Sequence, residues 1–280
     1  MRWLSTRIGL PSSALWLLGG TFITTIGNGM QGFTIALLLY EHTGSAAAFG
    51  GVIIFEQVLT FVMQVLAGPW VDRGDPRRTC VQVDLLRGVV VCCASALFGT
   101  GHLVLWVMLV SLVIRVAHPF YRAATFALAP AVVSREALGR YNGFTNISLQ
   151  AGQLTGIVLA GPVFYYLGGA TAFFINGLTF LFSALAISRI RLPAAEPANQ
   201  PAVGNAWNLV LTGWSEIAAL LWRQAGFAWH LLLNTADAVA VHLFNLISVP
   251  LIAERYAGSA YWLSTIGVVY ALGAMVAGAL

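Results

Sequence analysis

Long apolar stretches, separated by short polar segments, recur along almost the whole chain. A helix needs about 20 apolar residues to cross the hydrocarbon core of a bilayer. Eight stretches reach that length, and they run over residues 14–40, 44–71, 79–100, 103–127, 140–167, 170–189, 226–252 and 259–280. The sequence therefore predicts an all-α fold, a polytopic membrane helix bundle with eight transmembrane helices.

The composition points to lipid rather than water as the surrounding solvent. Of the 280 residues, 59% are hydrophobic and only 9% are charged, whereas soluble domains contain about 25% charged residues. This balance excludes an ordinary cytosolic enzyme and a disordered chain. The odd number of cysteines and their mostly intramembrane positions argue against a disulfide scaffold or a zinc site; they are Cys80, Cys92 and Cys93.

The positions of the basic residues predict the orientation in the membrane. All 14 are arginines, and a cytoplasmic N-terminus places 12 of them at or near the inner face. Arg255 then lies outside and Arg115 lies within the membrane. Such an asymmetry is typical of the positive-inside rule. We therefore expect a multi-pass protein of the inner (cell) membrane with both termini in the cytoplasm.

The proline-rich segment 190–205 (RLPAAEPANQPAVGNA) divides the chain. We predict a six-helix transmembrane bundle over 1–189, a cytoplasmic linker and interfacial amphipathic helix over 190–225, and two further membrane helices over 226–280. Gly-Ser-Ala opens both the second and the eighth stretch, at 44–46 and 258–260. This echo suggests two six-helix repeats, the second of them incomplete in a truncated chain. A homodimer is one way to complete the cavity between such halves.

The loop between the second and third stretches, residues 68–78 (GPWVDRGDPRR), carries the most specific motif. It resembles the signature of the major facilitator superfamily, in which a glycine, three residues and Asp-Arg precede a glycine and a basic pair. Asp75 stands where a second glycine is usual, as in the drug- and siderophore-exporting branch. Segments 83–87 (VDLLR) and 173–187 (FFINGLTFLFSALAI) are also similar to that branch.

This resemblance implies a gating motif that latches the two halves of a transporter together during alternating access. In physical terms, Gly68 would let two helices approach closely, and Asp72 would cap the helix that follows. The alternative is a charge cluster that only fixes the orientation. The residues that match the motif are Gly68, Asp72, Arg73, Arg77 and Arg78.

Exporters of this family also carry a Gly-Pro-x-x-Gly-Gly motif in the fifth span, where this chain has residues 152–157 (GQLTGI). Gln153 replaces the proline and Ile157 replaces the last glycine. The match is degraded, so the direction of transport does not follow from it.

Three ionisable residues lie near the middle of their apolar stretches: Glu56, Arg115 and Asp237. At 1.5 Å per residue, each lies about 16–20 Å from the end at which its stretch enters the membrane. Ionisable groups at this depth usually face a protein interior or a wet cavity. We predict Asp237 or Glu56 as the proton-coupling carboxylate. Arg115 would neutralise Glu56 or attract an anionic substrate.

Polar residues also recur on one face of five stretches, the pattern expected of helices that line an aqueous cavity. Interhelical hydrogen bonds without a transport role would give the same pattern. The uncharged residues that we select as candidates for substrate binding or proton coupling are Asn28, Gln31, Gln153 and Asn234.

Motifs for other chemistry are missing from the sequence, which has no phosphate-binding loop, no serine-hydrolase elbow and no metal-ligand spacing. We therefore expect no cofactor, no metal and no enzymatic activity. The leading interpretation is a secondary active transporter that exports a small hydrophobic or amphipathic compound, coupled to protons, by alternating access. The expected partners are this substrate, a proton or other ion gradient and the lipid bilayer, without nucleic acid. The alternatives are a nutrient importer of the same fold, a non-transporting truncated remnant and an integral-membrane enzyme.

Overall fold

The computed structural model describes residues 9–43, 46–72, 74–190, 206–236 and 239–240, with the single positions 243, 269, 273 and 276. These residues form helices and their connections and contain no strand. The fold is therefore all-α, as the sequence predicts. The chain divides into two compact units, residues 1–200 with 274–280 and residues 201–273, and each is considered separately.

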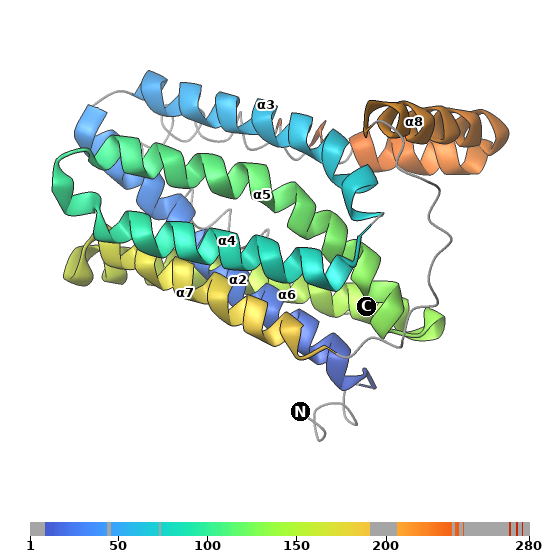
Figure 1. The fold of residues 1–280 in the computed structure, drawn as a ribbon, viewed down its shortest axis with the longest axis horizontal. Helices are drawn as coiled ribbons and strands as arrows, with labels where there is room; N and C mark the ends of the chain where they lie inside the picture. The colour runs from blue at the N-terminus through green and yellow to red at the C-terminus, as the bar shows by residue number, and fades with distance from the viewer. Residues whose placement is uncertain are drawn as a thin grey trace. The chain divides into compact units, whose positions relative to one another are not determined.

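Six long helices make up the described part of the first unit (Figure 1). Each lies within a few residues of one of the first six predicted membrane stretches, because the length of an apolar run determines where a membrane helix begins and ends. Two short 3-10 turns, η1 (Phe98–Thr100) and η2 (Arg135–Ala137), lie in the connections. The long helices are α2 (Ser12–Thr43), α3 (Ala46–Val71), α4 (Pro76–Ala96), α5 (Leu103–Val132), α6 (Leu138–Leu167) and α7 (Gly169–Ser188).

Helix α2 packs most extensively against α6 and α7, and α4 packs against α7 and α5. Helix α3 contacts mainly α5, so it lies at the edge of the bundle. Helices α2 and α3, although they follow one another directly in the sequence, share few contacts. The pairs α2–α6 and α3–α5 are each closely packed, whereas α2 has few contacts with α3 and α5. A space is therefore left between the two pairs.

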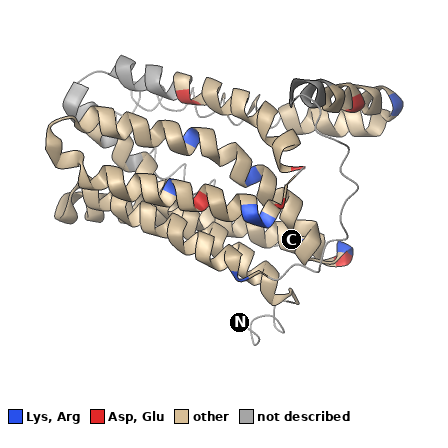
Figure 2. Ribbon diagram, in the orientation of Figure 1, with Lys and Arg blue, Asp and Glu red and all other residues tan. Residues whose placement is uncertain are grey.

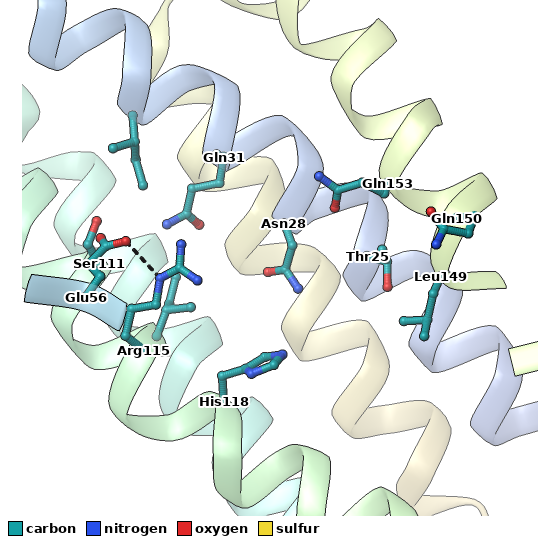
Figure 3. Close-up of a pocket in the computed structure, with 13 residues that line it drawn as sticks. Thr25, Asn28, Gln31, Glu56, Ser111, Arg115, His118, Leu149, Gln150 and Gln153 are labelled. Carbon is teal, nitrogen blue, oxygen red and sulfur yellow. Dashed lines mark hydrogen bonds and ion pairs between the residues drawn. The ribbon is translucent and has the colours of Figure 1, made fainter. Parts of the chain in front are cut away.

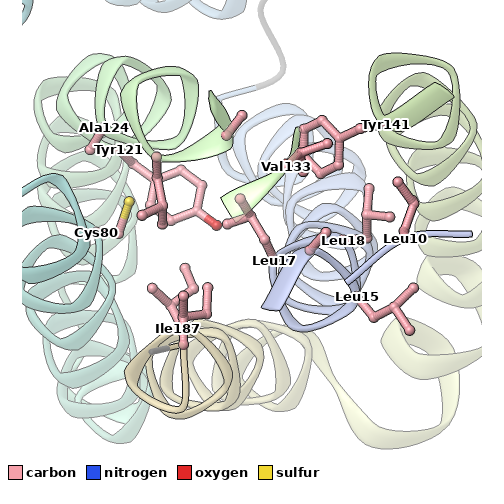
Figure 4. Close-up of a cluster of buried hydrophobic side chains, with 14 of the residues drawn as sticks. Leu10, Leu15, Leu17, Leu18, Cys80, Tyr121, Ala124, Val133, Tyr141 and Ile187 are labelled. Atoms are coloured by element: carbon pink, nitrogen blue, oxygen red, sulfur yellow. The ribbon is translucent and has the colours of Figure 1, made fainter. Parts of the chain in front are cut away.

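Two clusters of buried apolar side chains hold the bundle together at its two ends. The larger one contains Leu17, Tyr121 and Ile187 and joins the start of α2 to the ends of α5 and α7 (Figure 4). The second joins the opposite ends of these helices through Leu38, Val110 and Phe173, among others. Apolar packing thus joins helices of the bundle toward both of its ends.

The outer surface of the bundle is strongly apolar. Large side chains such as Phe61, Trp70 and Phe126 are exposed by 65% or more, which water would penalise and lipid tails would accept. Within the described residues, four helices are long and apolar enough to cross a membrane, namely those over Pro76–Ala96, Leu103–Val132, Arg135–Leu167 and Gly169–Ser188. The expected total of eight spans stays a prediction.

The start of α4 differs from the expectation that Asp72 caps it. The N-cap is Asp75, whose carboxylate accepts hydrogen bonds from the backbone N–H groups of Arg77 and Arg78, at 2.8 and 3.2 Å. Asp72 directly follows the last residue of α3, and its own N–H donates to Gly68 O. It lies too early in the loop to reach the free N–H groups of α4. Pro76 at the first helical turn reinforces the start at Asp75.

In the second unit, α8 covers Ala206–Arg223, and residues 225–236 are also helical. A helix is therefore present where the sequence predicts the interfacial amphipathic helix, and Trp214 and Trp222 on it are exposed. Its location at a membrane surface stays a prediction, as do the boundaries of the three predicted segments. Most of the predicted seventh and eighth stretches lies outside the described residues.

Candidate functional site

A cavity of about 450 Å³ opens inside the first unit, between α2, α3, α5 and α6 (Figure 3). Its size suits a small organic ligand. Most of the side chains around it are polar, although the bundle as a whole is apolar. The lining residues are Thr25, Asn28, Gln31, Gly32, Ile35, Glu56, Ser111, Ile114, Arg115, His118, Leu149, Gln150 and Gln153.

Helical periodicity explains how the sequence builds this lining. On α2 the cavity residues recur every three or four positions, from Thr25 through Asn28 and Gln31. The same spacing holds for Ser111, Arg115 and His118 on α5, so these side chains share one face of their helix. Five of the seven residues selected for substrate binding or proton coupling line this single cavity: Asn28, Gln31, Glu56, Arg115 and Gln153. Their roles stay predictions.

An ion pair between α3 and α5 lies at one side of the cavity. Arg115 Nε lies 2.9 Å from Glu56 Oε2, and the two side chains are 44% and 10% exposed. The structure thus contains the neutralising contact that the sequence offered as one role for Arg115. Figure 3 shows the rest of the guanidinium pointing away from Glu56, toward Gln31 and Asn28. The negative partner is covered, and the positive partner is open to the cavity.

The side-chain amide of Gln31 accepts a hydrogen bond from α7. Asn176 Nδ2 donates a hydrogen bond to Gln31 Oε1, and Asn176 is fully buried. The hydroxyl of Thr179 in turn lies 3.1 Å from Asn176 Oδ1. Asn176 therefore fixes the orientation of Gln31. Sequence reasoning missed it; the signal was a single amide inside the apolar run 173–187.

The hydroxyl groups of the cavity fall into two kinds. Thr25 Oγ1 donates to Thr21 O on its own helix at 2.7 Å, which satisfies it locally. Ser111 Oγ is buried and has no hydrogen-bond partner among the described residues. An unpaired buried hydroxyl is costly, and Ser111 Oγ is covered although the residue lines the cavity.

The two remaining predicted residues lie outside the described part of the first unit. Asp237 lies outside the described residues. Asn234 belongs to the second unit, where its side-chain amide donates to His230 O at 2.9 Å within the same helix. Their connection with the cavity therefore stays a prediction.

The loop motif makes a contact within the first unit. Arg77 Nη2 donates to Ser188 O at the carboxyl end of α7, where a cation is favoured by the helix dipole. Asp72 and Arg78 are exposed, and Arg73 lies outside the described residues. The close helix approach expected at Gly68 is not found in the described part of the chain, where a Cβ atom at this position would meet nothing within 4 Å.

A second charged pair, Asp84 and Arg87 on α4, is fully buried away from the cavity. The Arg87 guanidinium lies over the rings of Tyr121 and Phe180, 4.6 and 4.5 Å from their centroids. The sequence singled out 83–87 only as a family-like pattern and missed this role. The available signal was an acid and a base three residues apart, on one face of an apolar helix.

Comparison with known proteins supports the resemblance noted in the sequence. The family model described as Major Facilitator Superfamily matches residues 17–280, which is most of the chain. No curated protein matches the chain. The family match covers both the cavity and the loop motif.

Proposed function

Because the chain belongs to the Major Facilitator Superfamily, whose members are membrane transporters and not enzymes, we propose that it exports a small amphipathic or hydrophobic compound in exchange for protons. The chain is an integral membrane protein with a small-molecule substrate. The exporter assignment rests on the similarity of its loop motif and of segments 83–87 and 173–187 to the drug- and siderophore-exporting branch. Transport would proceed by alternating access across the cell membrane.

The observation that carries proton coupling is the Glu56–Arg115 ion pair at the wall of a polar cavity. Protonation of Glu56 removes the negative charge that holds Arg115, so a proton that enters the cavity releases the guanidinium. A pair that forms and breaks with protonation is a bistable element of the kind that coupling requires. Asp237 is the second candidate carboxylate.

The substrate would contact the amides of Asn28 and Gln31 on α2 and of Gln153 on α6. Asn234, in the second unit, stays a separate candidate for substrate binding. Ile35, Ile114 and Leu149 add apolar surface beside the cavity amides. This mixture supports an amphipathic compound better than a purely hydrophobic one.

The loop over 68–78 would latch the halves of the transporter on the cytoplasmic side. Arg77 already ties the start of α4 to the end of α7, so the loop is anchored on its own bundle. The exposed side chains of Asp72 and Arg78 are left to engage another part of the protein. We propose Gly68, Asp72, Arg73, Arg77 and Arg78 as this gating motif.

A nutrient importer of the same fold is the second candidate. The observation that favours it is the richness of the lining in amides and hydroxyls, which suits a polar metabolite. Import and export differ in the sign of coupling, because an importer binds proton and substrate together whereas an exchanger binds them in turn.

Gradient-driven transport in sealed proteoliposomes tests the proposal. The probes are ethidium, Nile red and fluorescein, which present a cationic, a neutral and an anionic compound. We expect at least one of them to accumulate only when a pH gradient is imposed, with the sign of the gradient giving the direction. The Glu56→Gln substitution should lower this accumulation to the level of protein-free vesicles while downhill exchange persists.

The matched control is Gln57→Ala, which alters the neighbouring, exposed side chain of α3 outside the cavity. It should leave the gradient response unchanged. Full pH-driven accumulation in the Glu56→Gln protein would rule out this carboxylate as the coupling group.

A further inference from the structure

We propose that Arg115 is the recognition group for an anionic substituent of the substrate, a carboxylate or a phosphate. This inference rests on the proposed transport function and names the substrate class of the same cavity. It goes beyond that function because neither the family match nor proton coupling requires a charged substrate.

The ion pair uses only one nitrogen of the Arg115 guanidinium. Glu56 engages Nε of Arg115, whereas a guanidinium has five N–H donors in a planar fork that suits carboxylate or phosphate oxygens. The two terminal nitrogens of Arg115 have no partner among the described residues and face the cavity. The charge presented to a ligand is therefore positive, since the Arg115 side chain is 44% exposed and the Glu56 side chain only 10%.

Amide side chains lie on the side of the cavity toward which this fork points. Asn28, on the same face of α2 as Gln31, also lines the cavity and brings a second amide. The oxygen of the Gln31 amide is occupied by Asn176, which leaves its NH₂ group for the cavity. A guanidinium and an amide NH₂ together can donate to an oxyanion. A cation would meet only Glu56, largely covered by its partner.

This arrangement has a consequence for coupling. The titratable or charged residues that line the cavity are Glu56 on α3 with Arg115 and His118 on α5, whereas α2 and α6 contribute amides, hydroxyls and apolar groups. A substrate anion and the Glu56 carboxylate compete for one guanidinium, so a proton on Glu56 favours anion binding. Proton and anion then bind together, which is the behaviour of the importer named as the second candidate, whereas the proton exchange proposed first would require the anion to leave when Glu56 is protonated.

Charge-selective thiol labelling tests the inference without any transport assay. The native residues Cys80, Cys92 and Cys93 are replaced by alanine, and a single cysteine is introduced as Asn28→Cys in the cavity. The purified protein is then treated with two methanethiosulfonate reagents of similar size, sulfonatoethyl (an anion) and trimethylammonioethyl (a cation). The labelling rate with the anionic reagent is divided by the rate with the cationic reagent. This ratio is then normalised by the same ratio for Gly99→Cys, an exposed position remote from the ion pair.

We expect the normalised ratio to favour the anionic reagent. The Arg115→Gln substitution should lower it by about tenfold or more, because a full charge a few ångströms away is removed. Glu56→Gln should raise it, and Arg115→Lys should keep it above one. The last two variants decide the question if Arg115→Gln does not fold. The proposal is overturned, even if transport is proton-coupled, by a normalised ratio at or below one in the Asn28→Cys protein with Glu56 and Arg115 intact. A ratio that these substitutions leave unchanged also overturns it.

Protection by small ions at matched ionic strength then separates the two anion classes. Slower labelling of Asn28→Cys in acetate than in phosphate assigns a carboxylate, and the reverse assigns a phosphate. Equal rates in acetate, phosphate and trimethylammonium chloride contradict a recognition site for anions. Absence of transport with clear anion selectivity would instead count against the proposed function alone.

Discussion

At the scale of single residues, the deepest charge in the described bundle is not in the cavity. Arg87 is completely buried on α4, paired with Asp84 and covered by the rings of Tyr121 and Phe180. Its partners come from α4, α5 and α7, so one guanidinium contacts three helices. Two aromatic faces compensate for the hydrogen bonds that its Nε and Nη1 atoms lack among the described residues.

The first prediction concerns this buried pair. Replacing Asp84 with alanine leaves a buried guanidinium unpaired and should lower the free energy of unfolding by about 3–5 kcal/mol. Replacing both residues, Asp84→Leu with Arg87→Met, should cost less because no uncompensated charge remains. Unfolding of the purified protein by SDS in mixed micelles measures both. Gln82→Ala, at an exposed position of the same helix, is the control, and an equal effect of Asp84→Ala and Gln82→Ala would refute the argument.

The two charged sites differ in how well the sequence predicts them. Glu56 and Arg115 were predicted because each stands in the middle of an apolar stretch, among polar residues at helical spacing. The grouping of Arg87 with Tyr121 and Phe180 could not be predicted, because aromatic residues are common in membrane helices and their partners are set by packing. The same holds for the contact of Gln31 with Asn176.

At the scale of helices, α2 and α6 touch through glycines. A Cβ atom at Gly152 would lie 2.8 Å from Phe22 O, and one at Gly156 would collide with Ile26 O. These glycines are four residues apart, the small-xxx-small spacing that lets membrane helices approach to backbone contact. The sequence presented them as remnants of an exporter motif, and their observed role is packing.

The second prediction compares two glycines of α6. Gly156→Ala should destabilise the bundle by about 1–3 kcal/mol, because the added methyl group meets backbone that cannot yield. Gly161→Ala, where a Cβ atom meets nothing within 4 Å in the described part of the chain, should be neutral or slightly stabilising, since alanine favours helix. Thermal unfolding of both proteins in the same detergent distinguishes them. Equal melting temperatures would show that α2 and α6 do not depend on this contact.

Helix limits were the most predictable feature of the elements, and helix partners the least. Apolar length alone placed α2 to α7 within a few residues, whereas the cap of α4 was assigned to Asp72 instead of Asp75. Both acids precede the helix, and only the actual end of α3 at Val71 decides between them. Which helix packs on which depends on side-chain shape across the interface, and a single sequence does not reveal it.

At the scale of the whole molecule, charge is distributed unevenly between the two ends of the first unit. Arginines gather at the end where α4 and α6 begin and where α5 and α7 finish (Figure 2). They include Arg77, Arg78, Arg135, Arg140 and Arg189. The connection at the other end between α4 and α5, residues 97–102 (LFGTGH), contains no arginine, lysine or acidic residue. An apolar belt of exposed side chains lies between the two ends.

The third prediction follows from this asymmetry. Positively charged connections are retained in the cytoplasm during insertion, so the arginine-rich end should face inward and the connection over 97–102 outward. In a background without native cysteines, Gly99→Cys should react with a membrane-impermeant maleimide in intact cells. Ser134→Cys, exposed between α5 and η2 at the opposite end, should react only after the membrane is opened. The reverse pattern would show that the bundle has the opposite orientation in the membrane. The arginine-rich end would then face outward, against the expectation from the positive connections.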